Sequence, residues 1–115
     1  MEHRARGSEQ LLERTGLTER MIEEIRSVIA EDERVDRVVL FGSRAKGSHR
    51  EGSDIDLAVY GNGIGRRDAS IWAERLEESL FPWSVDIVPI GDEIDTALLE
   101  DIDRVGFVLV DARPG

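Results

Sequence analysis

Apolar residues along the chain follow two periods, one typical of helices and one typical of strands. After Thr18, a residue suited to cap a helix, apolar residues recur at helical spacing and predict a helix from about Glu19 to Glu31. A second helical pattern opens at Arg67 or Asp68 and ends before Pro82. A third amphipathic stretch begins near residue 94 and ends at Gly106. Three helices are therefore expected.

The strand-like pattern occurs in four stretches rich in β-branched and apolar residues. We predict strands at Val35–Phe41, Asp54–Tyr60, Trp83–Ile90 and Phe107–Val110, most of them bounded by glycine. Residues 1–17 are expected to form a partly loose N-terminal segment with at most a short amphipathic turn, and residues 18–115 to form the folded domain.

Composition narrows the class of protein. The 115 residues suffice for one domain, and we find no run of about 18 apolar residues that would span a bilayer. The chain opens without an apolar signal segment and contains no cysteine. We therefore expect a soluble, cytoplasmic protein with no membrane partner.

The formal net charge of −10 opposes attraction to polyanionic DNA or RNA, so a nucleic-acid partner is not expected. Acidic residues are frequent in the second half of the chain. A solvated surface is the simplest explanation for them, and attraction of a basic partner is the alternative.

Candidate chemistry lies between the first two predicted strands. Asp54 and Asp56 alternate with apolar residues, so both carboxylates emerge on one face of the strand. Asp86 stands among apolar residues in the third strand and completes a three-aspartate cluster if that strand neighbours the second. Oxygen-only ligands favour Mg²⁺ first and Mn²⁺ second, and three carboxylates can hold two such ions roughly 3.5–4 Å apart. Alternatively, the first pair caps a strand and Asp86 is a hydrogen-bonded sheet residue.

Gly42 and Ser43 precede this pair and are suited to phosphate. Glycine lets the backbone approach a phosphate closely, and the hydroxyl with neighbouring N–H groups can bond triphosphate oxygens. Arg44 and Lys46 add positive charge beside the turn, although a solvated loop explains them equally well. Neither a P-loop nor a dinucleotide-binding glycine motif is present.

These motifs resemble the minimal nucleotidyltransferases (MNT proteins) of the DNA polymerase beta-like superfamily. The resemblance covers roughly residues 18–110 and rests on three segments: Leu40-Phe41-Gly42-Ser43-Arg44-Ala45-Lys46-Gly47, Ser53-Asp54-Ile55-Asp56-Leu57 and Val85-Asp86-Ile87-Val88. It implies an α+β nucleotidyltransferase fold, with a mixed sheet of about four strands and helices packed against it.

The resemblance also implies roles for single residues. Gly42 and Ser43 would hold the triphosphate of ATP, with Arg44, Lys46 and Ser53 as further nucleotide-binding candidates. The metal ligands would be Asp54, Asp56 and Asp86, and the last of these would help to activate the acceptor hydroxyl.

Small members of this family commonly act as antitoxins of helical HEPN-type toxins, and some transfer AMP from ATP to a toxin tyrosine. We therefore predict such an antitoxin. One alternative is an antitoxin that neutralises its toxin by binding alone. Another is a small-molecule nucleotidyltransferase of the antibiotic-modifying kind, whose acceptor pocket would need a partner or a homodimer.

Overall fold

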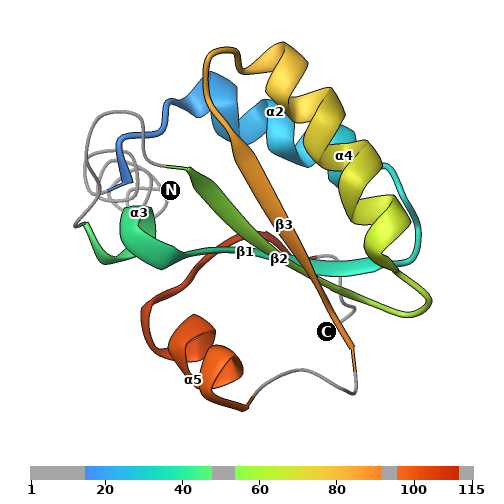
Figure 1. Ribbon diagram of the computed structural model, residues 1–115, viewed down its shortest axis with the longest axis vertical. Coiled ribbons are helices and arrows are strands. Elements are labelled where there is room, and N and C mark those ends of the chain that lie inside the picture. The colour runs from blue at the N-terminus through green and yellow to red at the C-terminus, as the bar shows by residue number, and fades with distance from the viewer. Residues whose placement is uncertain (1–14, 48–53, 92–95, 112–115) are drawn as a thin grey trace, which may run out of the picture.

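Helices lie on both faces of a four-stranded sheet in the computed structural model, which describes residues 15–47, 54–91 and 96–111 (Figure 1). In chain order the elements are α2 (Glu19–Ile29), β1 (Val35–Phe41), α3 (Gly42–Lys46), β2 (Ile55–Gly61), α4 (Arg66–Ser79), β3 (Val85–Ile90), α5 (Thr96–Val105) and β4 (Phe107–Asp111). The predicted α+β class is confirmed. None of the helices in these described ranges is long and apolar enough to cross a membrane.

The strands lie in the order β3-β2-β1-β4, which places β3 at one edge of the sheet. β1 runs antiparallel to β2 and β4, whereas β2 and β3 run parallel because α4 carries the chain back between them. The register pairs Asp56 with Phe41 on one side and with Asp86 on the other. The mixed sheet therefore brings the two separated aspartate motifs onto adjacent strands.

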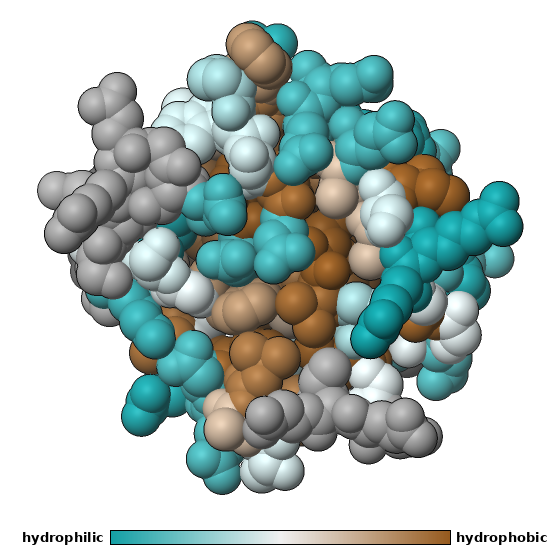
Figure 2. All heavy atoms as spheres, viewed as in Figure 1, coloured by the Kyte–Doolittle hydropathy of each residue, from teal (hydrophilic) through white to brown (hydrophobic). Residues whose placement is uncertain are grey.

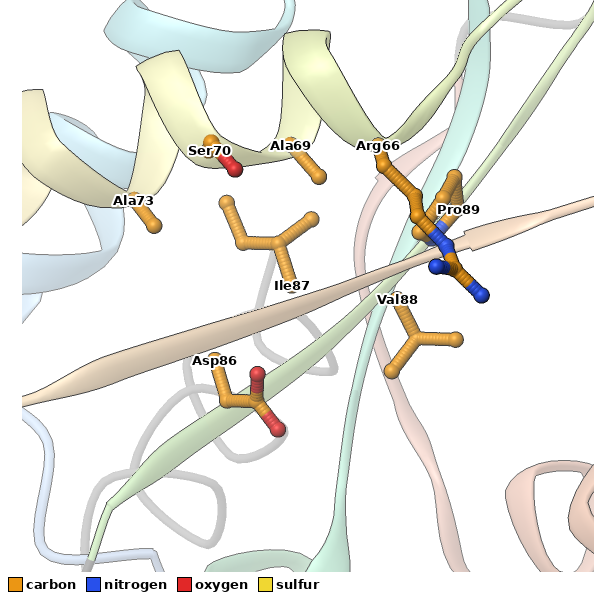
Figure 3. Close-up of a pocket in the computed structure, with 8 residues that line it drawn as sticks. All are labelled: Arg66, Ala69, Ser70, Ala73, Asp86, Ile87, Val88 and Pro89. Carbon is orange, nitrogen blue, oxygen red and sulfur yellow. The ribbon is translucent and has the colours of Figure 1, made fainter.

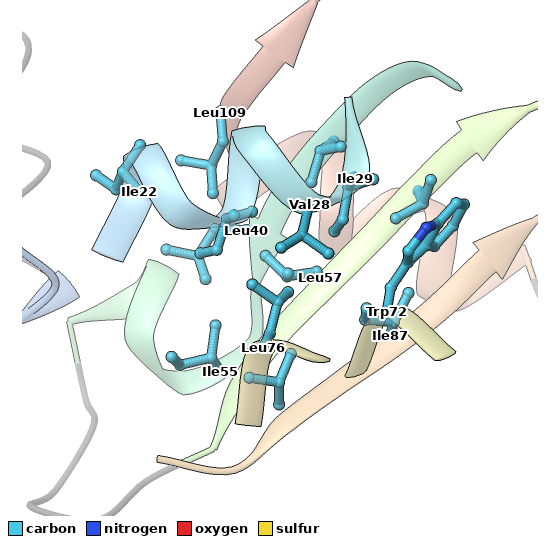
Figure 4. Close-up of a cluster of buried hydrophobic side chains, with 14 of the residues drawn as sticks. Ile22, Val28, Ile29, Leu40, Ile55, Leu57, Trp72, Leu76, Ile87 and Leu109 are labelled. Atoms are coloured by element: carbon cyan, nitrogen blue, oxygen red, sulfur yellow. The ribbon is translucent and has the colours of Figure 1, made fainter. Parts of the chain in front are cut away.

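The main core lies between the sheet and the helices α2 and α4, which cover the same face (Figure 1). Side chains from both helices interlock with those of the central strands in Figure 4, including Ile29, Leu40, Leu57 and Leu76, each fully buried. α2 begins where predicted, because the Thr18 hydroxyl accepts a hydrogen bond from the Met21 N–H at 3.1 Å.

The opposite face of the sheet carries a smaller cluster beneath α5, made of Val39, Phe41, Ala58 and Ile102. α5 covers only part of this face, so Val88 and Ile90 are half-buried there. The same face in Figure 2 shows hydrophilic side chains next to exposed apolar surface near the middle of the molecule. The sheet therefore has one closed face and one partly open face.

The structure differs from the sequence prediction in local detail. The segment after β1 forms the short helix α3, where we predicted only a turn; five residues are too few to show a helical period, and Gly47 in the left-handed region ends the helix. Thr15 and Leu17, assigned to the N-terminal segment, are both buried. The packed part of the chain therefore includes residues before Thr18, whereas the short amphipathic turn predicted within the N-terminal segment, around Leu11 and Leu12, lies outside the described residues.

Candidate active site

Side chains alternate between the two faces of β2, so its acidic residue, Asp56, lies on the other face from its core residues. Ile55 and Leu57 point into the main core and are fully buried, whereas Asp56 is half-buried on the opposite, partly open face. Asp86 occupies the same register position on β3, and Asp54, one residue before β2, is exposed. The strand pairing thus brings together the two motifs that the sequence keeps 30 residues apart.

The surroundings of the Asp56 carboxyl disfavour its negatively charged form. Burial raises the pKa of its carboxyl to about 6, and the nearby charges of Asp86 and Asp54 act in the same direction. Arg44 opposes the shift by attraction. A carboxylate that is desolvated and repelled by its neighbours favours a bound proton or a bound cation.

Gly42 borders this carboxylate directly. Its φ of 77° lies in the left-handed region, and a Cβ added there would overlap the Asp56 Oδ2 atom and come within 3.1 Å of its Cγ. A side chain at position 42 would therefore meet both backbone strain and a collision with the site. The glycine expected to approach a phosphate closely lies beside the carboxylate expected to bind metal.

The other predicted nucleotide-binding residues have different surroundings. Ser43 is half-buried in the first turn of α3. Lys46 is exposed at the end of α3, and its Nζ lies 3.3 Å from the Asp101 Oδ1 of α5. Ser53 lies outside the described residues. The role of each in binding nucleotide stays a prediction.

Arg44 is a core residue and is only 1% exposed. Its guanidinium lies 4.3 Å from the centre of the Trp83 ring, and its Nη1 donates a hydrogen bond to the Thr15 carbonyl oxygen at 2.7 Å. Burial lowers the pKa of this guanidinium, while Asp56 acts in the opposite direction. Arg44 thus links α3 to the segments before α2 and before β3, and its role in binding nucleotide stays a prediction.

We expect Arg44→Lys to lower the free energy of unfolding by about 2 kcal/mol, because an ammonium can neither stack flat on Trp83 nor reproduce the guanidinium geometry. Urea denaturation followed by tryptophan fluorescence measures this. Arg104→Lys is the matched control, since the Arg104 side chain is 76% exposed, and we expect it to change stability by less than about 0.5 kcal/mol. Equal stability of both variants would contradict the supporting role of Arg44.

Asp56 and Asp86 are paired across the β2–β3 ladder, but the three predicted aspartates do not form a ready-made metal cage in the described part of the chain. Within the three described ranges, no three His, Cys, Asp or Glu side chains lie close enough together to hold an ion. Carboxylates that repel each other are expected to stand apart until a cation draws them together. The oxygen-only donors and the raised pKa of Asp56 nevertheless fit a hard divalent cation.

A groove of about 380 Å³ lies beside Asp86, between β3 and α4 (Figure 3). Ser70, Ala69 and Ala73 form its helix side, and Arg66 reaches over Pro89 at one end. Nothing in the sequence indicated this groove, because exposed polar positions on a helix resemble ordinary solvated surface.

Glu77 is one of the acidic residues in the second half of the chain for which a solvated surface was the simplest explanation, but its Oε2 accepts a hydrogen bond from the Val85 N–H at 3.0 Å. This contact fixes the start of β3, one residue before Asp86. It depends on how α4 packs on β3, so no local signal could have revealed it.

Strand-borne carboxylates next to a glycine-serine turn are typical of enzymes that transfer phosphoryl or nucleotidyl groups. The nucleotidyltransferase domain family matches residues 22–107, and this chain belongs to that family. The family expected from the sequence motifs is thereby confirmed, and with it the class of enzyme. No curated protein matches the chain.

Solved structures with the same fold include several toxin–antitoxin complexes. One, determined with AMP-PNP, has 24% identity and a TM-score of 0.69, covering 78% of this chain and 73% of that one. A mutant of the MntA–HpeT complex has 25% identity and a TM-score of 0.66, with 83% of this chain and 74% of that one covered. A third, from Shewanella oneidensis, contains a tri-AMPylated HEPN toxin with an MNT antitoxin, at 22% identity, a TM-score of 0.63, and 79% and 70% covered.

Proposed function

We propose that this protein is a Mg²⁺-dependent nucleotidyltransferase that moves AMP from ATP to a hydroxyl, most simply a tyrosine hydroxyl, of a HEPN-type toxin and thereby acts as its antitoxin. The observation that carries the proposal is the position of Asp56. Its carboxylate is partly desolvated, acts electrostatically with Asp86 and Asp54, and lies against the backbone of Gly42. A partly buried carboxylate beside two like charges and a close glycine backbone is the arrangement expected of a functional site.

The site divides the reaction between two groups of residues. Gly42, Ser43 and Lys46 would orient the triphosphate through a close backbone approach, a hydroxyl and a positive charge. Asp54, Asp56 and Asp86 would hold two divalent ions, which would make the acceptor hydroxyl more acidic and neutralise charge on the leaving pyrophosphate. Arg44 would keep α3 in place from behind.

The transfer itself is an in-line displacement at the α-phosphorus of ATP. The acceptor oxygen forms a bond to this phosphorus, while the bond from the phosphorus to the oxygen bridging toward the β-phosphate breaks. Pyrophosphate leaves with that oxygen, and the hydroxyl proton passes to Asp86 or to water. The products are a phosphodiester-linked AMP on the partner and free pyrophosphate.

The choice of partner rests on the structural relatives. The three structures described above are toxin–antitoxin complexes; of these three, one was determined with AMP-PNP and another contains an AMPylated HEPN toxin. The expected acidic surface of this chain, with a formal net charge of −10, would also favour association with a basic partner.

The direct test combines this protein with Mg²⁺, ATP labelled on the α-phosphate and the HEPN-type protein encoded by the adjacent gene. We expect label on that protein, and at least about 100-fold less label with Asp86→Ala. Asp36→Ala is the matched control, because Asp36 is an exposed strand aspartate away from the site. Labelling that persists at full rate in Asp86→Ala would overturn the proposed role of this carboxylate.

A further inference from the structure

The outer edge of β3 can be assigned from its hydrogen bonding. The Ile55 N–H of β2 donates to the Ser84 carbonyl at 2.9 Å, and Ile55 pairs with Val85 in the parallel ladder. In such a ladder the backbone groups of alternate residues point to opposite sides. The backbone groups of Asp86 therefore face β2, whereas those of Ile87 face outward.

Most residues of β3 whose backbone faces away from β2 have no N–H group available for a further hydrogen bond. The Val85 N–H donates to Glu77, and Pro89 has no N–H. Ile87 thus offers both an N–H and a carbonyl on the edge that no described strand covers. One pair of backbone hydrogen bonds can form here with another extended chain.

The groove between β3 and α4 continues this edge. Figure 3 shows Ile87 pointing toward Ser70 and Ala69 on α4, while Asp86 points to the other side of the strand. Asp86 also lines the groove. A chain lying along the edge would therefore meet small, mostly apolar side chains on one side and reach the candidate catalytic carboxylate on the other.

We propose that an extended segment of the acceptor protein binds along this edge, pairs its backbone with Ile87, and carries its hydroxyl around β3 to Asp86. This inference rests on the proposed function and specifies how the acceptor is held. Backbone pairing at a sheet edge supplies affinity, and side-chain contacts in the groove supply specificity.

In-line geometry favours the acceptor over the nucleotide as the occupant. The attacking oxygen and the leaving pyrophosphate must lie on opposite sides of the phosphorus. Gly42 lies against Asp56 on one side, and β3 lies on the far side of β2, at the sheet edge. With the triphosphate at Gly42, the acceptor must arrive from the side of Asp86, where the groove lies.

Ser70→Trp tests this inference by filling the groove from an exposed position on α4, on the opposite side of β3 from the Asp86 side chain (Figure 3). We expect the KM for the HEPN-type protein to rise at least about tenfold, while affinity for a nonhydrolysable ATP analogue stays within about twofold. Ile71→Trp is the matched control: Ile71 is the next residue of α4, is 47% exposed and does not line the groove, so transfer should equal that of the wild type.

Hydrogen exchange gives a second readout that does not depend on activity. Formation of the complex without ATP should slow exchange of the Ile87 amide, and Ser70→Trp should remove this protection. Unchanged KM in Ser70→Trp would overturn the inference, and so would a loss of nucleotide affinity, which would assign the groove to the nucleotide. If the wild-type protein transfers no label from ATP to the HEPN-type protein, the proposed function fails instead. Slower exchange of the Ile87 amide in the complex would then still show whether the partner binds along the outer edge of β3.

Discussion

Asp56→Asn is expected to unfold at a higher temperature than the wild type at pH 8, although it should have lost nucleotidyl transfer. Burial and the nearby charges of Asp86 and Asp54 raise the pKa of Asp56 from its ordinary value of 3.8 to about 6 in the folded protein. At pH 8 the carboxylate is therefore ionised where the fold disfavours ionisation. Each pKa unit corresponds to about 1.4 kcal/mol, so we expect a gain of about 1–3 kcal/mol from the neutral amide.

The sign of the pH dependence follows from the same shift. Below about pH 4 the carboxyl is protonated in both the folded and the unfolded state, so the wild type loses nothing. Between about pH 4 and 6 the unfolded chain ionises more readily than the folded one, and the wild type loses stability. The advantage of Asp56→Asn should therefore grow across this interval and stay constant above it.

Thermal unfolding at pH 4, 5, 6 and 8 measures this prediction. Asp36→Asn is the control, because Asp36 is an exposed aspartate of β1, and its effect should be small at every pH. Added Mg²⁺ should raise the unfolding temperature of the wild type but change that of Asp56→Asn little, since the cation replaces the missing proton. A variant no more stable than the wild type at pH 8 would show that Asp56 is not under electrostatic stress.

Gly42→Ala should be both less stable and nearly inactive. The left-handed backbone at Gly42 costs an alanine about 1–2 kcal/mol, and the added Cβ would overlap the Asp56 carboxylate. Either Asp56 or the start of α3 must then move. Because a displacement of about 1 Å in a reacting group can cost about 100-fold in rate, we expect at least that loss of transfer.

Gly63→Ala separates the two causes. Gly63 has a similar φ of 73°, but an added Cβ would meet no atom within 4 Å. We therefore expect Gly63→Ala to lose about 1–2 kcal/mol of stability and to keep normal transfer. Urea denaturation and labelling of the partner should be measured on both variants. Full activity in Gly42→Ala would contradict the close fit of glycine and carboxylate.

Most of the helices and strands of the fold could be predicted from the amino-acid sequence alone. The bounds of β1 were predicted correctly, and the other strands and helices differ by a few residues at their ends. Local sequence suffices for these elements because the long helices repeat apolar residues at helical spacing, and the strands are short runs rich in β-branched and apolar residues. α3 was missed, since its helical form depends on Gly47 and on the burial of Arg44.

The candidate site was predictable in part. The spacing of Gly42-Ser43 and Asp54-x-Asp56 indicated the chemistry, and alternation along β2 indicated a common face. The conformation of Arg44 was not predictable, because the sequence does not show that Trp83 and the Thr15 carbonyl lie beside it. From sequence alone, a positively charged residue next to a phosphate-binding turn fits two roles equally well: it can bind the phosphate, or it can stabilise the fold around the turn.

The amino-acid sequence by itself determined all the described elements except α3, the two acidic motifs and the family, because each of these depends on residues near one another in the chain. Only the tertiary structure decided that β2 and β3 are parallel neighbours, which sets Asp86 beside Asp56, and that the outer edge of β3 opens into a groove. These features depend on strand order and on helix packing, and both are contacts between residues far apart in the chain, on which local periodicity carries no information.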